Sequence, residues 1–481
     1  MNHDWKFRLP PSSPHSLNMA DLFVTRRQFL SRCGAGFGAV SLAGLGAMGL
    51  LPGIQAIAAD ASTSPLAPRQ PHFKPKAKRV LHIFAAGAPS HLDTWDPKPK
   101  LKQMDGQPMP GDSNNAVFGS PFSFTKMGQS GIDVSEVFPN IGEHIDKLAV
   151  VRSMFTEIPD HDLATLMMNT GDSRLIKPSV GSWVNYGLGS ENQNMPGFVA
   201  LGPGGVSAAN IRSAFLPGIY QGTAVDSQQT KVEKLIENIK SNYTSLKEQR
   251  RQLDLLHQLN DAHSQNLRKD EQLEARLEAF ELAYQMQMEA TDIFDISKEP
   301  ESVRKSYAAD TQQGRQMLIA RRLLEKGVRF VQVWHGGWDN HGNLAVDLKN
   351  RANEIDRPIA ALLADLEQRG MLADTLVIWG GEFGRSPSAD ANAMSARPGR
   401  THNRDAFSIW LAGGGIKGGT VYGETDELGS RAIANRVAVP DLHATILHLL
   451  GFNHEKLTYR YNGRDFRLTN VSGNVVNGIV S

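Results

Sequence analysis

The positions of the apolar residues predict alternating strands and helices from residue 79 onward. Helical periods over Arg315–Lys326 and Asp347–Arg369 each end just before a glycine. Strands that are apolar on both faces and alternate with helices indicate an α/β fold, with a mostly parallel central sheet and helices on both faces. The six runs that predict strands are Arg79–Ala86, Leu148–Met154, Gly197–Leu201, Arg329–His335, Leu376–Gly381 and Phe407–Gly413.

Residues 231–291 depart from this alternation. The segment is charged and amphipathic, with Val232 and Leu235 on one apolar stripe and Leu273 and Leu277 on another. This pattern predicts a helical hairpin, or a small helical subdomain, inserted into the α/β core. We expect the insertion to provide packing or oligomer contacts rather than catalytic groups.

The N-terminal residues 1–58 have the pattern of an export signal. Arg26 and Arg27 precede an uncharged stretch rich in glycine, alanine and leucine, and Ala56-Ile57-Ala58 offers a small-x-small cleavage site. The segment resembles a twin-arginine signal peptide. It predicts passage through the twin-arginine export machinery, a periplasmic or otherwise exported protein, and no stable membrane span after cleavage. An uncleaved membrane anchor is the alternative.

The rest of the chain divides into a linker and one large domain. Residues 59–78 are rich in proline, serine and lysine and have no apolar period, which is typical of a linker. Residues 79–481 form the predicted α/β domain, which includes the insertion. The whole chain has 481 residues, which suits a globular protein with a large core.

Charge and cysteine content narrow the chemistry. The 51 Lys and Arg residues nearly balance the 50 Asp and Glu residues, and a net charge of +1 argues against a general nucleic-acid binder. The single cysteine, Cys33, lies in the predicted signal, so an internal disulfide and cysteine-based metal sites are excluded. Any metal must be held by histidine and carboxylate groups.

Such groups follow or precede several predicted strands. They are Asp93 after the first strand, Asp339 and His341 after the fourth, Glu382 after the fifth and His402 before the sixth. Loops beyond the carboxyl ends of parallel strands converge on one crevice, so these residues are predicted to share a site. Carboxylates and imidazoles suit one or two divalent ions, and the residue types do not distinguish zinc, manganese, calcium and iron. Taken singly, each Asp also fits a helix cap and each His a structural residue.

Four motifs carry a family resemblance. They are Leu81–Asp93 (LHIFAAGAPSHLD), His335–Gly342 (HGGWDNHG), Gly381–Arg385 (GEFGR) and Gly399–His402 (GRTH). Together they resemble domain of unknown function family 1501, which is similar to the alkaline phosphatase superfamily with its sulfatases and phosphatases. The resemblance covers nearly the whole mature chain and implies an alkaline phosphatase-like fold.

The resemblance also implies ligands for two metal ions. One ion would be held by Asp339, His341 and His402, and the second by Asp93 and Glu382. The Asp-x-His spacing of Asp339 and His341 is shorter than the superfamily's usual spacing. In addition, Phe383 stands where the superfamily has a second histidine ligand, and a phenyl ring cannot bind a metal.

The expected nucleophile is a further departure from the superfamily. Counting back from Gly171 places His161 where sulfatases carry a modified Cys or Ser. We therefore predict that His161 replaces the missing ligand at Phe383 and that a metal-bound hydroxide attacks the ester directly. Thr165, one helical turn later, is the fallback nucleophile.

Two arginines and three tryptophans complete the candidates. Arg385 and Arg404 lie within three residues of predicted ligands, where they would pair with sulfate or phosphate oxygens or form structural salt bridges. The tryptophans would stack on sugar rings or pack in the core, packing being favoured; they are Trp95, Trp338 and Trp379.

The sequence thus predicts an exported metal-dependent hydrolase of sulfate or phosphate esters, with a small molecule or carbohydrate as substrate. The alternative is a non-catalytic metal-binding or glycan-binding protein on a decayed scaffold, for which the missing nucleophile and Phe383 are the best support. A phosphomutase is disfavoured because no phospho-acceptor is present at the expected position.

Overall fold

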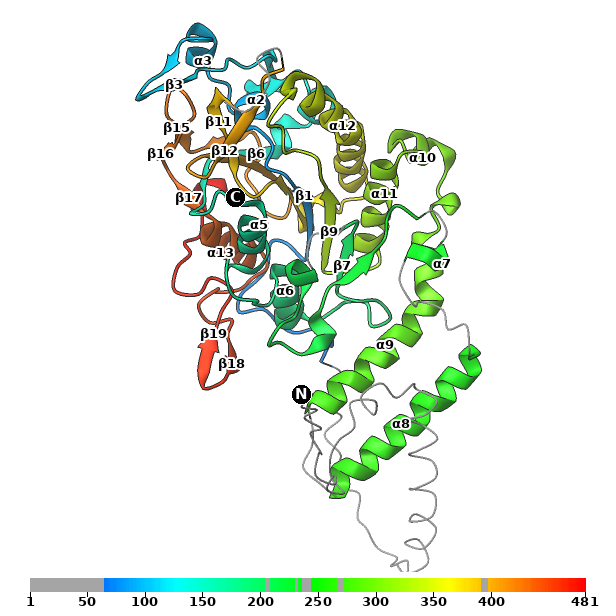
Figure 1. Cartoon of the computed structure of the whole chain (residues 1–481). Coiled ribbons are helices and arrows are strands. Elements are labelled where there is room, and N and C mark those ends of the chain that lie inside the picture. The colour runs from blue at the N-terminus through cyan, green and yellow to red at the C-terminus, as the bar shows by residue number, and fades with distance from the viewer. Residues whose placement is uncertain (1–64, 204–207, 230–231, 236–243, 267–270, 391–396) are drawn as a thin grey trace, which may run out of the picture. The chain divides into compact units, whose positions relative to one another are not determined.

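The computed structural model describes residues 65–481 except 204–207, 230–231, 236–243, 267–270 and 391–396 (Figure 1). The predicted signal peptide and the first residues of the predicted linker lie outside the described part. Within that part, no helix combines the length and the apolar composition that a bilayer span requires.

The central sheet contains nine described strands, in the order β14-β6-β13-β10-β1-β9-β7-β8, with β17 paired to β6. Strands β10, β1, β9, β7 and β8 run parallel, whereas β13 is antiparallel to both of its neighbours. All six predicted strands lie in this sheet, so the mostly parallel sheet is confirmed. The reversed direction of β13 was not predicted. The strands are β1 (Arg79–Ala85), β6 (Leu148–Phe155), β7 (Phe198–Leu201), β8 (Thr223–Val225), β9 (Phe330–His335), β10 (Thr375–Gly380), β13 (Phe407–Ala412), β14 (Thr420–Tyr422) and β17 (Val437–Ala438).

Helices cover both faces of this sheet, as the apolar strands predicted. Alternate residues of β1 point to opposite faces, so that Leu81 and Ile83 enter one core cluster and Val80 and Phe84 enter the other. The first cluster also contains the apolar residues of α11 (Gln312–Glu325) and α12 (Leu344–Gln368). The second contains those of α6 (Val180–Leu188) and α13 (Val439–Leu449), on the other side of the sheet (Figure 1).

The predicted helical insertion is present as two long helices. They are α8 (Leu246–Asn266) and α9 (Glu271–Phe294), preceded by the short α7 (Val232–Leu235). An ion pair of 2.5 Å joins Arg250 on α8 to Glu281 on α9. The segment is therefore a helical hairpin.

Smaller elements were not predicted. The described residues also form five two-stranded sheets. One of them, β11 with β12, matters for the site. These strands are β2 (Pro108–Met109) with β3 (Asp112–Ala116), β4 (Phe124–Met127) with β5 (Ile132–Ser135), β11 (Gly384–Ala389) with β12 (Arg400–Asn403), β15 (Glu424–Thr425) with β16 (Ala432–Ala434), and β18 (Tyr459–Tyr461) with β19 (Arg464–Phe466). The remaining helices are α2 (His91–Thr94), α3 (Pro99–Gln103), α4 (Pro139–Gly142), α5 (His161–Thr170) and α10 (Glu301–Ser306).

The three candidate tryptophans lie in the core. Trp95, Trp338 and Trp379 are each at most 1% exposed. Trp95 stacks on Phe138 with ring centroids 5.2 Å apart, and Trp379 stacks on Trp410 at 6.3 Å. Buried rings cannot stack on a sugar in solvent, so these tryptophans stabilise the fold.

Candidate metal centre

The carboxyl ends of four sheet strands meet at one edge of the sheet. Strands β1, β9 and β10 are parallel, and β6 has the same direction because it is antiparallel to β13, which is antiparallel to β10. The segments that follow these strands carry the predicted site residues Asp93, His161, Asp339, His341 and Glu382. The topology therefore brings residues distant in sequence to one place.

His161 is the first residue of α5. The helix begins there because the side chain of Asp160 accepts a hydrogen bond of 3.0 Å from the backbone N–H of Leu163. It ends at Gly171, which adopts a left-handed conformation with φ of 71°. The first cap fixes where the helix starts, at His161, and the second fixes where it ends.

Four side chains form the candidate metal centre: His161, Asp339, His341 and His402, whose potential ligand atoms all lie within 4.8 Å of one another. The Nε2 atoms of the three imidazoles lie 3.2, 3.0 and 3.6 Å from Asp339 Oδ1, in the order His161, His341, His402. The side chains of Asp339 and His341 are 45% and 42% exposed. The centre is therefore open to a substrate on one side.

Each imidazole is held from behind through its other nitrogen. The Nδ1 atom lies 2.6 Å from Glu382 Oε1 in His161 and 2.5 Å from Asp390 Oδ2 in His341. In His402, Nδ1 lies 2.7 Å from the carbonyl oxygen of Pro159. Outer carboxylates and carbonyls in this arrangement are typical of metal-binding histidines, because they fix the tautomer and the ring orientation.

The tautomers show that these residues fit a cation. A carbonyl oxygen can only accept, so His402 Nδ1 donates to Pro159, and in the neutral ring Nε2 then carries a lone pair. His341 Nδ1 faces a carboxylate, which favours the same tautomer. The two Nε2 atoms nevertheless lie only 3.0 Å apart, and the Nε2 of His161 faces the same carboxylate oxygen, Asp339 Oδ1, at 3.2 Å. A cation between these atoms would relieve the repulsion.

The kinds of donor atom narrow the choice of ion. Three imidazole nitrogens and one carboxylate oxygen suit zinc, iron or manganese. Calcium prefers six to eight oxygen ligands, so this set of donor atoms suits it less well than the other predicted ions.

The electrostatic field of the centre favours positive charge. Burial lowers the pKa of His161, but hydrogen bonds and charges from Asp339 and Glu382 outweigh burial and raise it to about 9. Burial acts to raise the pKa of Asp339, yet hydrogen bonds from His161 and His402 and the charge of Arg385 hold it far below its usual range. The groups that keep a proton on His161 would equally stabilise a bound cation.

Arg385 holds Asp339 in place. Its Nη2 lies 2.5 Å from Asp339 Oδ1 and 2.6 Å from the carbonyl oxygen of Gly87, while Nε donates to the carbonyl of Ala88. The side chain is 1% exposed. A guanidinium so fully engaged positions the carboxylate, and this placement does not favour its predicted contact with a sulfate or phosphate. Arg404 is 52% exposed and donates to the carbonyl of Glu157.

Asp93 and Glu382 are placed differently from their predicted roles as metal ligands. Asp93 is fully buried, and its carboxylate pairs with Arg400 at 2.6 Å and accepts a hydrogen bond from Ser90. It therefore neutralises a buried guanidinium outside the centre. Glu382, which is 1% exposed, contacts His161 and accepts a hydrogen bond of 3.0 Å from Gly87 N–H. It lies behind His161, one of the candidate ligands.

Phe383 packs beside the centre, and Thr165 is buried. The ring of Phe383 is 4.7 Å from those of both His161 and His402, so it packs against the imidazoles. Thr165 is only 3% exposed on α5, and burial does not favour a nucleophile.

Two hydrogen-bond partners of the histidines were not predicted from the sequence, namely Asp390 and the Pro159 carbonyl. Asp390 follows β11, a short strand whose residues Gly384–Ala389 have no apolar pattern. No sequence signal marks a backbone carbonyl as a partner for histidine.

The fold and the centre together define a class: an α/β protein with a mostly parallel sheet and a cluster of three imidazoles and a carboxylate at the carboxyl edge of its strands. Its family follows from the sequence. Residues 77–480 match the model of the family described as "Protein of unknown function (DUF1501)", and the chain belongs to that family. No curated protein matches the sequence.

Solved structures similar to the chain include a sulfatase, a protein in complex with a neocarrahexaose and an alkaline phosphatase. The PsFucS1 sulfatase from Pseudoalteromonas sp. is 13% identical, with 79% of this chain and 68% of that chain covered and a TM-score of 0.33. Ps i-CgsB in complex with k-i-k-neocarrahexaose is 11% identical, with 78% and 72% covered and a TM-score of 0.33. The alkaline phosphatase from the Antarctic bacterium TAB5 is 12% identical, with 72% and 95% covered and a TM-score of 0.31.

Proposed function

We propose that the protein is an exported metal-dependent hydrolase of sulfate or phosphate esters, acting on a small-molecule or carbohydrate ester. The observation that carries the proposal is the convergence of three imidazole Nε2 atoms on Asp339 Oδ1, with every Nδ1 hydrogen-bonded outward. His161, Asp339, His341 and His402 are the proposed ligands. Export rests on the N-terminal sequence pattern alone.

The residues around the centre have separate tasks. When bound, a divalent ion lowers the pKa of a coordinated water toward about 7 and polarises the ester. Glu382 and Asp390 orient two imidazoles and add negative charge behind them, and Arg385 fixes Asp339. With Thr165 buried, we infer that water is the nucleophile and that no covalent enzyme intermediate forms.

The experiment compares metal content and turnover in the purified mature protein. We expect His161→Ala to lose most of its bound metal and its turnover of aryl sulfate or aryl phosphate, because one of four ligands is removed. His257→Ala is the control, since His257 is a partly exposed histidine on α8 outside the centre. Unchanged metal content in His161→Ala would refute the ligand role.

A second candidate function is metal or glycan binding without catalysis. The engagement of Arg385 with Asp339 and two backbone carbonyls favours it, because this arginine then offers little to an anionic ester. Stoichiometric metal with no turnover on either ester class would favour this candidate.

A further inference from the structure

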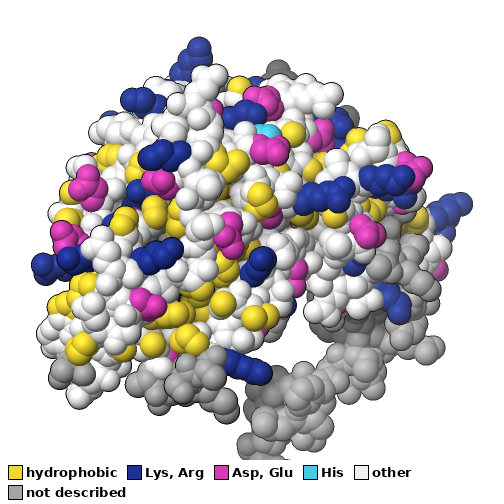
Figure 2. Space-filling view, turned by 90° about the horizontal axis from the view of Figure 1, so that it is seen from above, with side chains coloured by type: hydrophobic (Ala, Val, Ile, Leu, Met, Phe, Trp, Pro, Cys, Tyr) yellow, Lys and Arg dark blue, Asp and Glu magenta, His cyan; other side chains and the backbone are white. Residues whose placement is uncertain are grey.

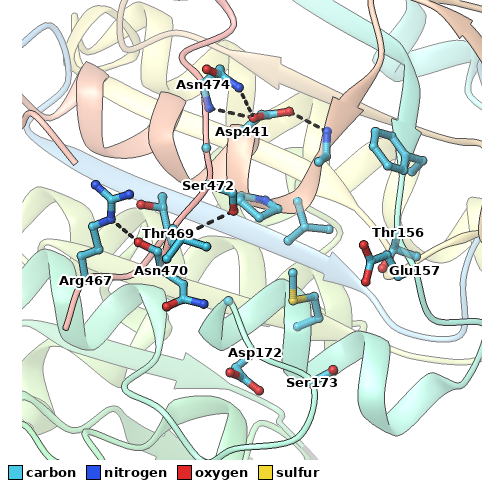
Figure 3. A pocket seen from close by; sticks show the side chains of 18 of the residues that line it. Thr156, Glu157, Asp172, Ser173, Asp441, Arg467, Thr469, Asn470, Ser472 and Asn474 are labelled. Atoms are coloured by element: carbon cyan, nitrogen blue, oxygen red, sulfur yellow. Dashed lines mark hydrogen bonds between the residues drawn. The ribbon is translucent and has the colours of Figure 1, made fainter. Parts of the chain in front are cut away.

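A large cavity lies beside the candidate metal centre. Its volume is about 810 Å³, which lies within the range of about 300–1,000 Å³ typical of small-molecule sites. It is bounded by residues 155–158, by the C-terminal part of α5, by the start of α13 and by residues 467–474 (Figure 3). We call it the C-terminal cavity.

One short segment connects this cavity to the centre. Thr156 and Glu157 line the cavity, while the carbonyl of Pro159, two residues later, accepts the hydrogen bond from His402. Helix α5 makes a second connection, because it starts at His161 and its Met167 lines the cavity. Six residues of helix correspond to about 9 Å. Two short segments of the chain, residues 157–159 and 161–167, therefore join the cavity to the centre.

The lining of the cavity disfavours a negatively charged ligand. Four of its side chains are carboxylates: Glu157, Asp172, Asp441 and Glu455. Arg467 is the one basic side chain among the lining residues, and it pairs with Glu455 at 3.3 Å. Asp172 also has a cationic partner, Lys177 at 2.7 Å, but the lining as a whole carries more negative than positive charge, which opposes a second sulfate or phosphate.

The remaining lining groups suit hydroxyl-bearing rings. Hydroxyl and amide side chains alternate with apolar ones such as Ile158, Met167 and Val439, and the polar ones labelled in Figure 3 are Thr156, Ser173, Thr469, Asn470, Ser472 and Asn474. A sugar ring presents both hydroxyls and apolar C–H faces. This mixture of uncharged donors, acceptors and apolar surface matches it.

We propose that the C-terminal cavity binds an uncharged saccharide portion of the substrate while the ester lies at the metal centre. The inference rests on the proposed function and makes it more specific. The preferred substrate carries its ester at one end and no second anionic group in the portion that enters the cavity. Figure 2 shows the face seen from above Figure 1, where basic and acidic side chains are interspersed. The described part of that face has no extended basic patch that would attract a polyanion.

The test is an array of uncharged and sulfated oligosaccharides probed with the full mature protein. Ser173→Trp fills the cavity and should lower binding of uncharged glycans at least tenfold. Glu157→Lys reverses an exposed lining charge and should shift preference toward sulfated glycans. Glu248→Lys, on exposed α8, is the matched charge control and should change nothing.

Several outcomes would overturn the proposal: no uncharged glycan bound by the wild type, equal binding by Ser173→Trp, or equal effects of Glu157→Lys and Glu248→Lys. The array is repeated after chelation, because binding in the cavity needs no metal. Retained glycan binding without any ester turnover would refute the proposed hydrolase and leave the saccharide site standing.

Discussion

The Glu382→Gln variant removes one negative charge from behind the candidate metal centre and keeps the size of the side chain. Glu382 Oε1 lies 2.6 Å from His161 Nδ1, and the side chain is only 1% exposed. Loss of an outer partner of a metal-binding histidine lowers metal affinity about 10–100-fold. Because burial limits screening by solvent, we expect the upper end, about 100-fold or about 2.7 kcal/mol.

The assay is a competition titration of metal-free protein with zinc and a chelator of known affinity. Glu354→Gln is the matched control, because Glu354 Oε2 contacts a different histidine, His335, at 2.9 Å. His335 ends β9 and precedes the segment that carries Asp339, so this control reports general loosening of that segment. We expect it to lower zinc affinity by less than about threefold, well short of the loss expected at an outer partner of a ligand.

Two results would refute the reasoning. If Glu382→Gln kept the zinc affinity of the wild type, the contact between Glu382 and His161 would not support zinc binding by His161. Equal losses in both variants would show that the effect comes from a loosened segment and not from His161.

Two further predictions concern stability. Burial lowers the pKa of His82 to about 3 and that of His443 to about 4, from 6.5. Below pH 6.5 the unfolded chain therefore binds protons that the folded chain does not. As the pH decreases from 6.5, each histidine lowers the free energy of unfolding by about 1.4 kcal/mol per pH unit. Urea unfolding at pH 7 and pH 5 measures this change in the free energy of unfolding. A His443→Gln variant with the same pH dependence as the wild type would contradict the prediction. Asp93→Asn leaves buried Arg400 without its counter-ion and should lower the free energy of unfolding in urea by about 3–5 kcal/mol. Asp93→Leu combined with Arg400→Met should recover most of this loss. A loss below about 1 kcal/mol in Asp93→Asn would contradict the role of the buried pair.

Much of the fold could be predicted because it depends on local patterns. An apolar run of six residues bounded by glycine or a helix is visible in the sequence, and all six such runs are strands of one sheet. The direction of β13 was not predictable. A run that is apolar on both faces fits a parallel or an antiparallel neighbour equally well.

The candidate site could be predicted in part. The rule that loops converge beyond parallel strands is enough to bring Asp339, His341 and Glu382 to one edge. It does not say which atom of each side chain faces which neighbour. Arg385 stands beside His402 because β11 and β12 pair antiparallel in that register, and a strand pair between two short polar segments has no sequence pattern.

The sequence by itself therefore determined the α/β class, six of the nine described strands of the central sheet, the family resemblance and the types of residue available for metal binding. Only the tertiary structure decided their arrangement. Asp93 is paired with Arg400, Glu382 stands behind His161, and Asp390 supports His341. The physical reason is that strand and helix formation follows from neighbours a few residues apart. The environment of a carboxylate depends on groups separated by 49 to 307 residues, as in the hydrogen bonds of His341 with Asp390 and of Arg400 with Asp93.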